Sequence, residues 1–316
     1  MRRSGTILAG VIAVCVTFAF MGALLNAAEI ESTAPKAAHL PLPFHNLEGM
    51  SGAFAVPSAY LCNPAPAGQV FGLPSVGGMY VHLGYGRSLE AGTITENVLG
   101  RVELGYGLDH FDVGDLGQTI LKETDINISK EAVNLDNFNL RYEILKDGEF
   151  DTAWVPALTA GVTYKYNETE KALNDELNGT LKAIGITDND DFDYTLFATK
   201  MIPGLPRPVL VTAGMRSTTA AQIGLLGFTD DRTIVGEGSV CVLATNKLAF
   251  AAEYRQIPNN YQSIPGVVGS PDSWWTLCTG YIVNEHMTLS AGYANFGTLL
   301  NHEADGAWGV ALKYEF

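Results

Sequence analysis

Side chains of opposite charge stand two residues apart at four places in the sequence. These pairs are Arg101/Glu103, Arg141/Glu143, Glu253/Arg255 and Lys313/Glu315. Residues i and i+2 of a strand lie on one face, about 6–7 Å apart, so each pair would place both charges on the same side of a sheet. Such charges either form ion pairs with neighbouring strands and brace a wall, or they line a permeation path and select among solutes.

Three further charged residues, Lys165, Arg216 and Glu237, fall on the same face of predicted strands, among Gly, Thr and Ser. Together with the four pairs they are our candidates for lining a lumen and setting its selectivity. The sequence has no GxSxG nucleophile elbow, and its Gly-rich pieces do not fit a phosphate-binding loop. We therefore predict no catalytic residues, no cofactor and no enzymatic activity.

Acidic residues cluster in the predicted connections between strands. They occur in "DHFDVGD" at 109–115, in "DNDDFD" at 188–193 and at Asp230–Asp231. Binding of a divalent cation is one interpretation of such clusters. However, "DNDDFD" lacks the glycine and the distal Glu of an EF-hand loop, so a solvated acidic loop is the interpretation we favour. We predict no metal site.

Alternation of apolar and polar residues recurs after about residue 78 and predicts the elements that position these side chains. Clear examples are "MYVHLGYG" at 79–86, "FNLRYEI" at 138–144 and "AWGVALKYEF" at 307–316. Twelve such segments can be found, and the connections between them are alternately long and short through most of the chain. Outer-membrane barrels have long extracellular loops and short periplasmic turns. The sequence therefore predicts an all-β transmembrane protein, an antiparallel up-and-down β-barrel of about twelve strands.

The two faces of each strand predict which side meets lipid. The apolar face carries almost no charge, so we assign it to lipid and the polar face to the lumen. At residues 79–86 this assignment turns Met79, Val81 and Leu83 toward lipid, and Tyr80 and His82 toward the lumen. A soluble, lipocalin-like barrel is the alternative, because its apolar face would point inward.

The N-terminal part of the chain differs from the rest in composition. Residues 1–28 have the pattern of a cleaved signal peptide, in which Arg2 and Arg3 precede an apolar run and small residues; an uncleaved anchor helix is the alternative. Without them, 17 basic and 34 acidic side chains remain, a net charge of −17 that excludes nucleic acid as an electrostatic partner. Residues 29–77 are predicted to be a periplasmic leader or a lumen plug, and residues 78–316 the barrel.

Two local features add to this organisation. Residues 168–185 place leucines on one helical stripe, which predicts a short amphipathic helix in a long loop. Cys241 and Cys278 both fall on the predicted lumen face, with the strand at 247–256 between their strands. Two strand spacings are about 9.5 Å, which exceeds the Cα separation that a disulfide allows, so we expect these thiols not to bond to each other.

The last strand resembles the terminal recognition strand of bacterial outer-membrane proteins. Its apolar side carries Trp308, Leu312, Tyr314 and the final Phe316. The resemblance implies that the barrel-assembly machinery reads these residues. The segments "EYRQIPNNY", "SWWTLCTGYIVNEHMTLSAGYANFG" and "LEGMSGAFAVPSAYLCNP" are also similar to an uncharacterised family of bacterial outer-membrane barrels. This resemblance implies fold and location, and it leaves the substrate open.

These observations predict a passive, porin-like channel for small hydrophilic solutes in the bacterial outer membrane. The expected partners are outer-membrane lipid, the assembly machinery, and small solutes or cations. A weak cation preference is expected from acidic loops at the outer mouth, especially Asp188, Asp190, Asp191 and Asp193. The alternative is a non-conducting structural or assembly component whose lumen is plugged by residues 29–77.

Overall fold

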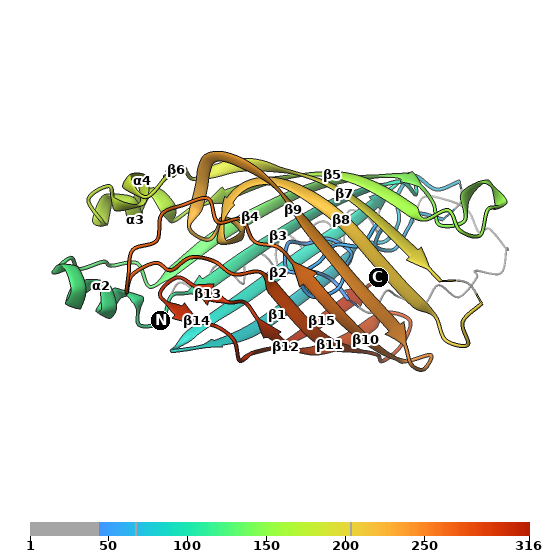
Figure 1. The fold of residues 1–316 in the computed structure, drawn as a ribbon. Coiled ribbons are helices and arrows are strands. Elements are labelled where there is room, and N and C mark those ends of the chain that lie inside the picture. Colours follow the sequence, from blue (N-terminus) through green and yellow to red (C-terminus); the bar gives the residue numbers. More distant parts are fainter. Residues whose placement is uncertain (1–43, 67, 203) are drawn as a thin grey trace.

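Twelve antiparallel strands form a closed barrel in the computed structural model, which describes residues 44–66, 68–202 and 204–316 (Figure 1). The wall strands are β1 Ser75–Gly84, β2 Arg87–Val98, β3 Val102–Asp112, β4 Ala132–Leu145, β5 Ala157–Asn167, β7 Asp190–Met201, β8 Val209–Ala221, β9 Gly227–Leu243, β10 Leu248–Arg255, β11 Trp274–Ile282, β12 Met287–Asn295 and β15 Ala307–Glu315. Pairing of β15 with β1, and of β9 with β10, closes the wall. The predicted fold class is therefore confirmed.

Smaller elements lie in the connections. They are β6 Ile186–Asp188, β13 Thr298–Leu299, β14 His302–Glu303, α2 Leu116–Thr124, α3 Glu170–Glu176, α4 Thr180–Ala183 and the 3-10 turns η1 Glu149–Asp151 and η2 Gln222–Gly224. The three α-helices sit at one end of the barrel, which we call the loop end; the other is the turn end (Figure 1). None of the helices in the described part of the chain is long and apolar enough to cross a membrane.

The helix predicted within residues 168–185 is present as α3 and α4. The break falls at Asn178 and Gly179, which both have positive φ values of 54° and 80°. Leucines of both helices are buried against the loop end. Helix α2 was not predicted, because its stretch "LGQTILKET" shows no long apolar periodicity.

The outer face of the barrel is apolar and the inner face is polar. On β4, Phe138, Leu140 and Tyr142 are about half exposed, whereas Asn139 and Arg141 between them are buried. This is the arrangement of a membrane-spanning barrel, and it is the reverse of a soluble one. The alternative of a lipocalin-like soluble barrel is therefore rejected.

The predicted faces of β1 are wrong. Met79 and Val81 point inward and are buried, whereas Tyr80 is exposed. Pairing sets Tyr80 opposite Val310 and His82 opposite Trp308 on the outer face of β15. The assignment fails because the lumen beside β1 contains apolar side chains. The apolar residues of β1 therefore face the lumen and not the lipid.

Register through the middle of the sheet agrees with the predicted strand order. Ala251 of β10 pairs with Cys241 on one side and with Cys278 on the other. Both cysteines are buried free thiols on the inner face, with one whole strand between them.

An arginine on the lipid face should destabilise the barrel strongly. Leu104 on β3 is exposed on the outer face, and Leu104→Arg is expected to cost about 2–4 kcal/mol in a refolding titration, the range for a basic residue near the bilayer midplane. The matched control is Leu121→Arg, because Leu121 is equally exposed but lies on α2 outside the wall. Equal losses of unfolding free energy in both variants would contradict the lipid-face assignment.

Candidate functional site in the lumen

Residues 44–62, which we call the plug, lie inside the barrel. Figure 1 shows this segment, in blue, enclosed by the strands. All of its residues are buried except Gly52, Ser58 and Tyr60. Short turns fold it back on itself, with isolated bridges between His45 and Ser51 and between Gly52 and Pro57. The lumen is therefore occupied by the chain's own N-terminal segment.

The carboxylate of Glu48 lies at the centre of the lumen among three basic side chains of the wall. Lys165 Nζ on β5 is 2.6 Å from it, Arg216 on β8 is 2.9 Å away, and Arg255 on β10 is 3.1 Å away. Glu48 and Lys165 have no exposed side-chain surface. A buried carboxylate is costly unless basic groups or hydrogen-bond donors satisfy it.

Two wall carboxylates complete what we call the central cluster, which consists of Glu48, Lys165, Arg216, Arg255, Asp193 and Glu237. Arg216 bonds Glu237 at 2.6 Å and Asp193 at 3.0 Å. Arg255 Nε lies 3.7 Å from Glu237. Three cations thus face three carboxylates, and only Glu48 among the acids belongs to the plug.

The central cluster also sets the protonation state of Glu48. Burial acts to raise its pKa, but the neighbouring Arg216, Arg255 and Lys165 outweigh this effect and hold the pKa well below its usual range. Glu48 is therefore ionised at neutral pH, and it contributes a full negative charge to the contact between plug and wall.

Two further wall carboxylates hold the backbone of the plug. Glu253 on β10 accepts N–H bonds from Phe54, Ala55 and Val56 at 2.7–3.1 Å. Glu103 on β3 accepts a hydrogen bond from the N–H of Cys62 at 2.7 Å and another from Arg141 Nη1 at 2.7 Å. These N–H groups have no strand partner, so the carboxylates satisfy donors that burial would otherwise leave unpaired.

Inward-facing glycines make room for the plug. A Cβ on Gly107 of β3 would lie 2.7 Å from the carbonyl carbon of Glu48, and one on Gly309 of β15 would lie 2.7 Å from the ring of Phe54. Glycine within a strand marks a place where another chain segment approaches closely. On the sequence alone these glycines are simply members of the polar face. Their repeated occurrence on that face is the signal that another chain segment fills the lumen.

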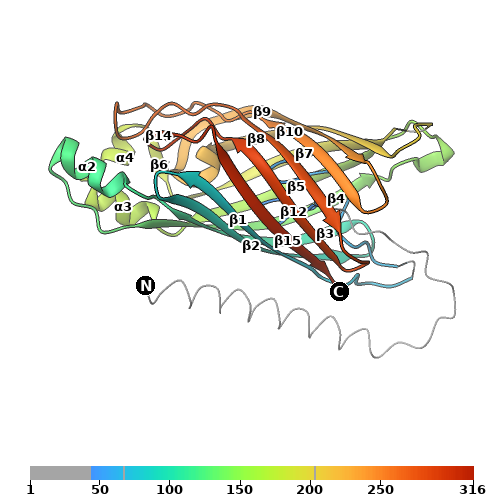
Figure 2. The same ribbon diagram turned by 90° about the horizontal axis from the view of Figure 1, so that it is seen from below.

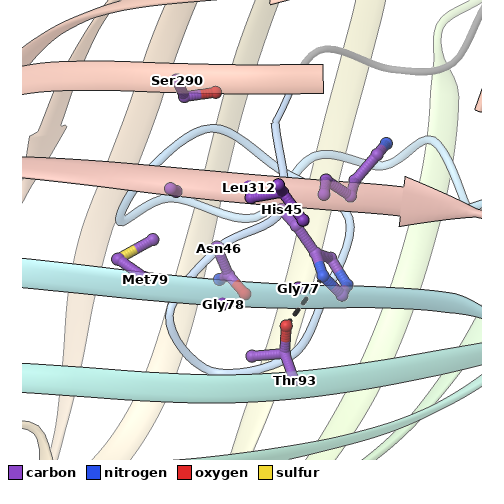
Figure 3. A pocket seen from close by; sticks show the side chains of 10 residues that line it. His45, Asn46, Gly77, Gly78, Met79, Thr93, Ser290 and Leu312 are labelled. Carbon is purple, nitrogen blue, oxygen red and sulfur yellow. Dashed lines mark hydrogen bonds between the residues drawn. The ribbon is translucent and has the colours of Figure 1, made fainter. Parts of the chain in front are cut away.

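At the edge of the plug, His45 and Asn46 line a small pocket against β1, β2, β12 and β15 (Figure 3). His45 Nδ1 and the Thr93 hydroxyl are 2.9 Å apart. Burial lowers the pKa of His45 to about 3, with Lys313 and Arg141 adding to the effect. The ring is therefore neutral at physiological pH and packs as an uncharged group.

The lumen assignment holds for all but one of the candidate charged residues. Ten are buried on the inner face: Glu103, Arg141, Glu143, Lys165, Arg216, Glu237, Glu253, Arg255, Lys313 and Glu315. Arg101 is the exception, because it follows the β2–β3 turn and pairs with Glu149 at 2.6 Å in a half-exposed position. Among the predicted pairs, only Lys313 and Glu315 bond to each other, at 2.8 Å.

The acidic run at 188–193 is divided between surface and lumen. Asp188 and Asp190 are exposed, and Asp191 pairs with Arg232 at 2.5 Å. Asp193, by contrast, is buried in the central cluster. Placing it in the mouth was wrong, because β7 begins at Asp190 and turns alternate residues inward.

A second segment enters the lumen from the loop end. The tip between β8 and β9, residues 222–226, is buried, and Gln222 and Ile223 have positive φ values of 48° and 61°. Such a conformation is strained for a β-branched residue. Lys165 Nζ donates to the Ile223 carbonyl at 2.9 Å, and Asn167 donates to the Gly224 carbonyl at 2.9 Å. The tip thus contacts the same lysine as the plug.

The C-terminal strand is part of the closed wall, between β12 and β1 (Figure 2). Trp308, Leu312 and Phe316 are exposed on its outer face, and the rings of Tyr314 and Phe316 meet edge to face at 5.0 Å. These positions suit a membrane interface. Recognition of the strand by an assembly machinery stays a prediction.

Cys62 offers a test of how firmly the plug is bound. Its thiol is buried, and burial, with Glu103 adding to the effect, raises its pKa from 9.0 to about 12. Because the thiolate is the reactive form, we expect a maleimide to label Cys62 about a thousandfold more slowly than a free cysteine at pH 8. Mass spectrometry of a variant with Cys15→Ser, Cys241→Ser and Cys278→Ser isolates this thiol. Rapid labelling in the folded barrel would show that the plug leaves the lumen readily.

The closed wall, its apolar outer face and its polar, filled lumen define a transmembrane β-barrel of the outer-membrane type with an internal plug. The chain belongs to the family described as "Protein of unknown function (DUF3034)", whose model matches residues 44–313. No curated protein matches the chain.

Solved structures with a similar barrel include the KdgM porin, with a TM-score of 0.47, 9% identity, and coverage of 77% of this chain and 99% of that one. The NanC porin has a TM-score of 0.45, 10% identity, and coverage of 77% and 98%. The COG4313 outer membrane channel from Pseudomonas putida F1 has a TM-score of 0.43, 10% identity, and coverage of 80% and 98%. A likeness at these identities concerns the barrel architecture alone.

Proposed function

We propose that the protein is a channel of the bacterial outer membrane that its own plug closes in the resting state. Small hydrophilic solutes pass when residues 44–62 move out of the lumen. The role is one of passage and not of catalysis. The open pore and the plugged barrel, which are alternatives on the sequence alone, are then two states of one molecule.

The chemistry of the contact between plug and wall carries this proposal. Beside an apolar part formed by residues such as Phe54, the contact has a charged and polar part, in which Glu48 meets three wall cations and Glu253 and Glu103 accept hydrogen bonds from plug N–H groups. A filling that never moved could be apolar, because a well-packed apolar core is at least as stable as buried ion pairs. Charged surfaces, in contrast, are hydrated once they separate, so water can enter where the plug was.

A permanently closed structural barrel is the second candidate. The observation that favours it is the loop-end tip, residues 222–226, which fills the lumen on the other side of the central cluster. Because Lys165 bonds to both the plug and the tip, solute passage requires the tip to be released together with the plug. A conductance measurement therefore separates the two candidates.

The direct test is to fill the space that the plug occupies. Gly107→Leu places a side chain where Glu48 lies, since even a Cβ would come within 2.7 Å of its carbonyl carbon. We expect the full-length variant to conduct in planar bilayers far more than the wild type, and to label at Cys62. Gly78→Leu is the control, because Gly78 on the outer face of β1 has open space around it.

Unchanged conductance in Gly107→Leu, together with rapid labelling of Cys62, would contradict the channel. That combination would mean that the plug had moved without opening a path, as expected for the structural barrel. The ion preference would be read from the reversal potential of the same variant, with mouth acids favouring cations only at low salt.

A further inference from the structure

We propose that the wall groups around Glu48 form a binding site for a carboxylate-bearing solute, and that Glu48 is its tethered occupant in the resting state. The role in passage rests on the proposed function. The site itself consists of Lys165, Arg216 and Arg255, one residue from each of three strands. The expected ligand is a small organic anion with an accessible carboxylate.

The geometry around Glu48 is that of carboxylate recognition. Arg216 reaches both oxygens, with Nη1 3.3 Å from Oε1 and Nη2 2.9 Å from Oε2. Arg255 also reaches both, at 3.1 Å each. Lys165 adds a bond to Oε1 at 2.6 Å. Two forked arginines and a lysine on one carboxylate make charge-assisted, bidentate contacts, which match the planar shape of the group.

Wall carboxylates hold Arg216 in place without the plug, and they lie within 4 Å of Arg255 and Lys165. Arg216 Nε donates to Glu237 at 2.6 Å and its Nη1 donates to Asp193 at 3.0 Å. The Arg255 guanidinium also lies near Glu237, at 3.7 Å. These contacts lie between wall strands, so they persist when Glu48 leaves. Prior orientation of the donors lowers the cost of binding a free anion.

The charge balance selects an anion. With Glu48 removed, three cations face Asp193 and Glu237, which leaves one positive charge without a counter-ion at the centre of the lumen. The buried carboxylate of Asp109 does not supply this counter-ion, because it accepts a hydrogen bond from the Asn137 amide at 2.9 Å and forms no ion pair with the three bases in the described part of the chain. The constriction would thus draw in one carboxylate, the charge that Glu48 supplies in the resting state. An anion preference at the constriction differs from the weak cation preference that the acidic mouth loops predict.

Chemical rescue tests the site directly. Glu48→Ala removes the carboxylate and leaves space for acetate in the full-length protein. We expect acetate, compared with chloride at equal ionic strength, to raise the thermal unfolding midpoint of this variant saturably, by about 3 °C at concentrations well above its dissociation constant. The wild type should show no such difference, because Glu48 already fills the site.

Two further variants keep the test decisive. Glu48→Gln fills the same space with an amide, so the acetate effect should be much smaller than in Glu48→Ala. Adding Arg255→Met to Glu48→Ala removes one of the two forked arginines, and the effect should disappear. Folding of each variant is checked by heat-modifiable gel mobility. Equal midpoints in acetate and chloride for folded Glu48→Ala would overturn the site.

The rescue assay needs no conductance, so its outcome is independent of the channel. Saturable acetate binding without conductance in Gly107→Leu would retain the anion site and reject the channel. Conductance in Gly107→Leu without acetate binding in Glu48→Ala would retain the channel and reject the anion site.

Discussion

Glu48→Lys is expected to expel the plug and open the lumen. The new ammonium group would face Lys165, Arg216 and Arg255, which in the resting state lie 2.6–3.1 Å from the carboxylate. Leaving buried charges uncompensated costs about 3–5 kcal/mol, and about 1.4 kcal/mol corresponds to a tenfold change in an equilibrium. The ratio of open to closed molecules should therefore rise by about a hundredfold or more. Planar-bilayer conductance and labelling of Cys62 measure the two consequences separately.

Glu48→Gln is the matched control, since it keeps the size of the side chain and adds no positive charge. Its effect on conductance should lie between the wild type and Glu48→Lys. If Glu48→Lys stayed closed and unlabelled at Cys62, the central cluster would not be what holds the plug.

The same cluster predicts how closure depends on pH. The pKa of Glu48 is lowered by its basic neighbours, from an ordinary value of 4.5. A lowered folded-state pKa gives stabilisation that is present above the ordinary pKa and is lost as pH falls through the lowered value. We therefore expect the contribution of Glu48 to closure to be constant between pH 5 and 8, and the difference in conductance between the wild type and Glu48→Gln to shrink only below about pH 4.5.

Arg216→Met should cause the second large effect, a loss of stability. Arg216 contacts Glu48 at 2.9 Å, Asp193 at 3.0 Å and Glu237 at 2.6 Å, so its removal leaves buried carboxylates short of a counter-charge. Breaking a buried pair by removing one partner costs about 3–5 kcal/mol. Refolding titrations in lipid or detergent measure the change in unfolding free energy.

Arg101→Met is the same substitution at a half-exposed position. Arg101 pairs with Glu149 at 2.6 Å outside the lumen, and solvent-screened pairs of this kind contribute little to stability. A loss in Arg101→Met as large as in Arg216→Met would argue against a special role of the buried cluster.

The sequence by itself determined the wall. Strict alternation in β4, β5 and β15 follows from having lipid on one side and polar groups on the other, so "FNLRYEI" and "AWGVALKYEF" could be assigned to strands and faces without a structure. The same reasoning placed Lys165, Arg216 and Glu237 inside, because a charge on the lipid face is too costly to occur there by chance. Alternation failed at β1, where both faces meet apolar groups.

Only the tertiary structure decided what occupies the lumen. Residues 44–62 form turns and isolated bridges but no helix or strand. Their sequence therefore shows no alternation of apolar and polar residues that could have predicted where they lie. Nothing in the local sequence of "LEGMSG" shows that Glu48 meets bases that are 117, 168 and 207 residues away. Those contacts exist because closing the barrel brings β5, β8 and β10 around one axis. Asp193, which the sequence placed at the mouth, lies at the centre for a related reason. The register of β7 against its neighbours fixes how deep in the barrel each of its side chains lies.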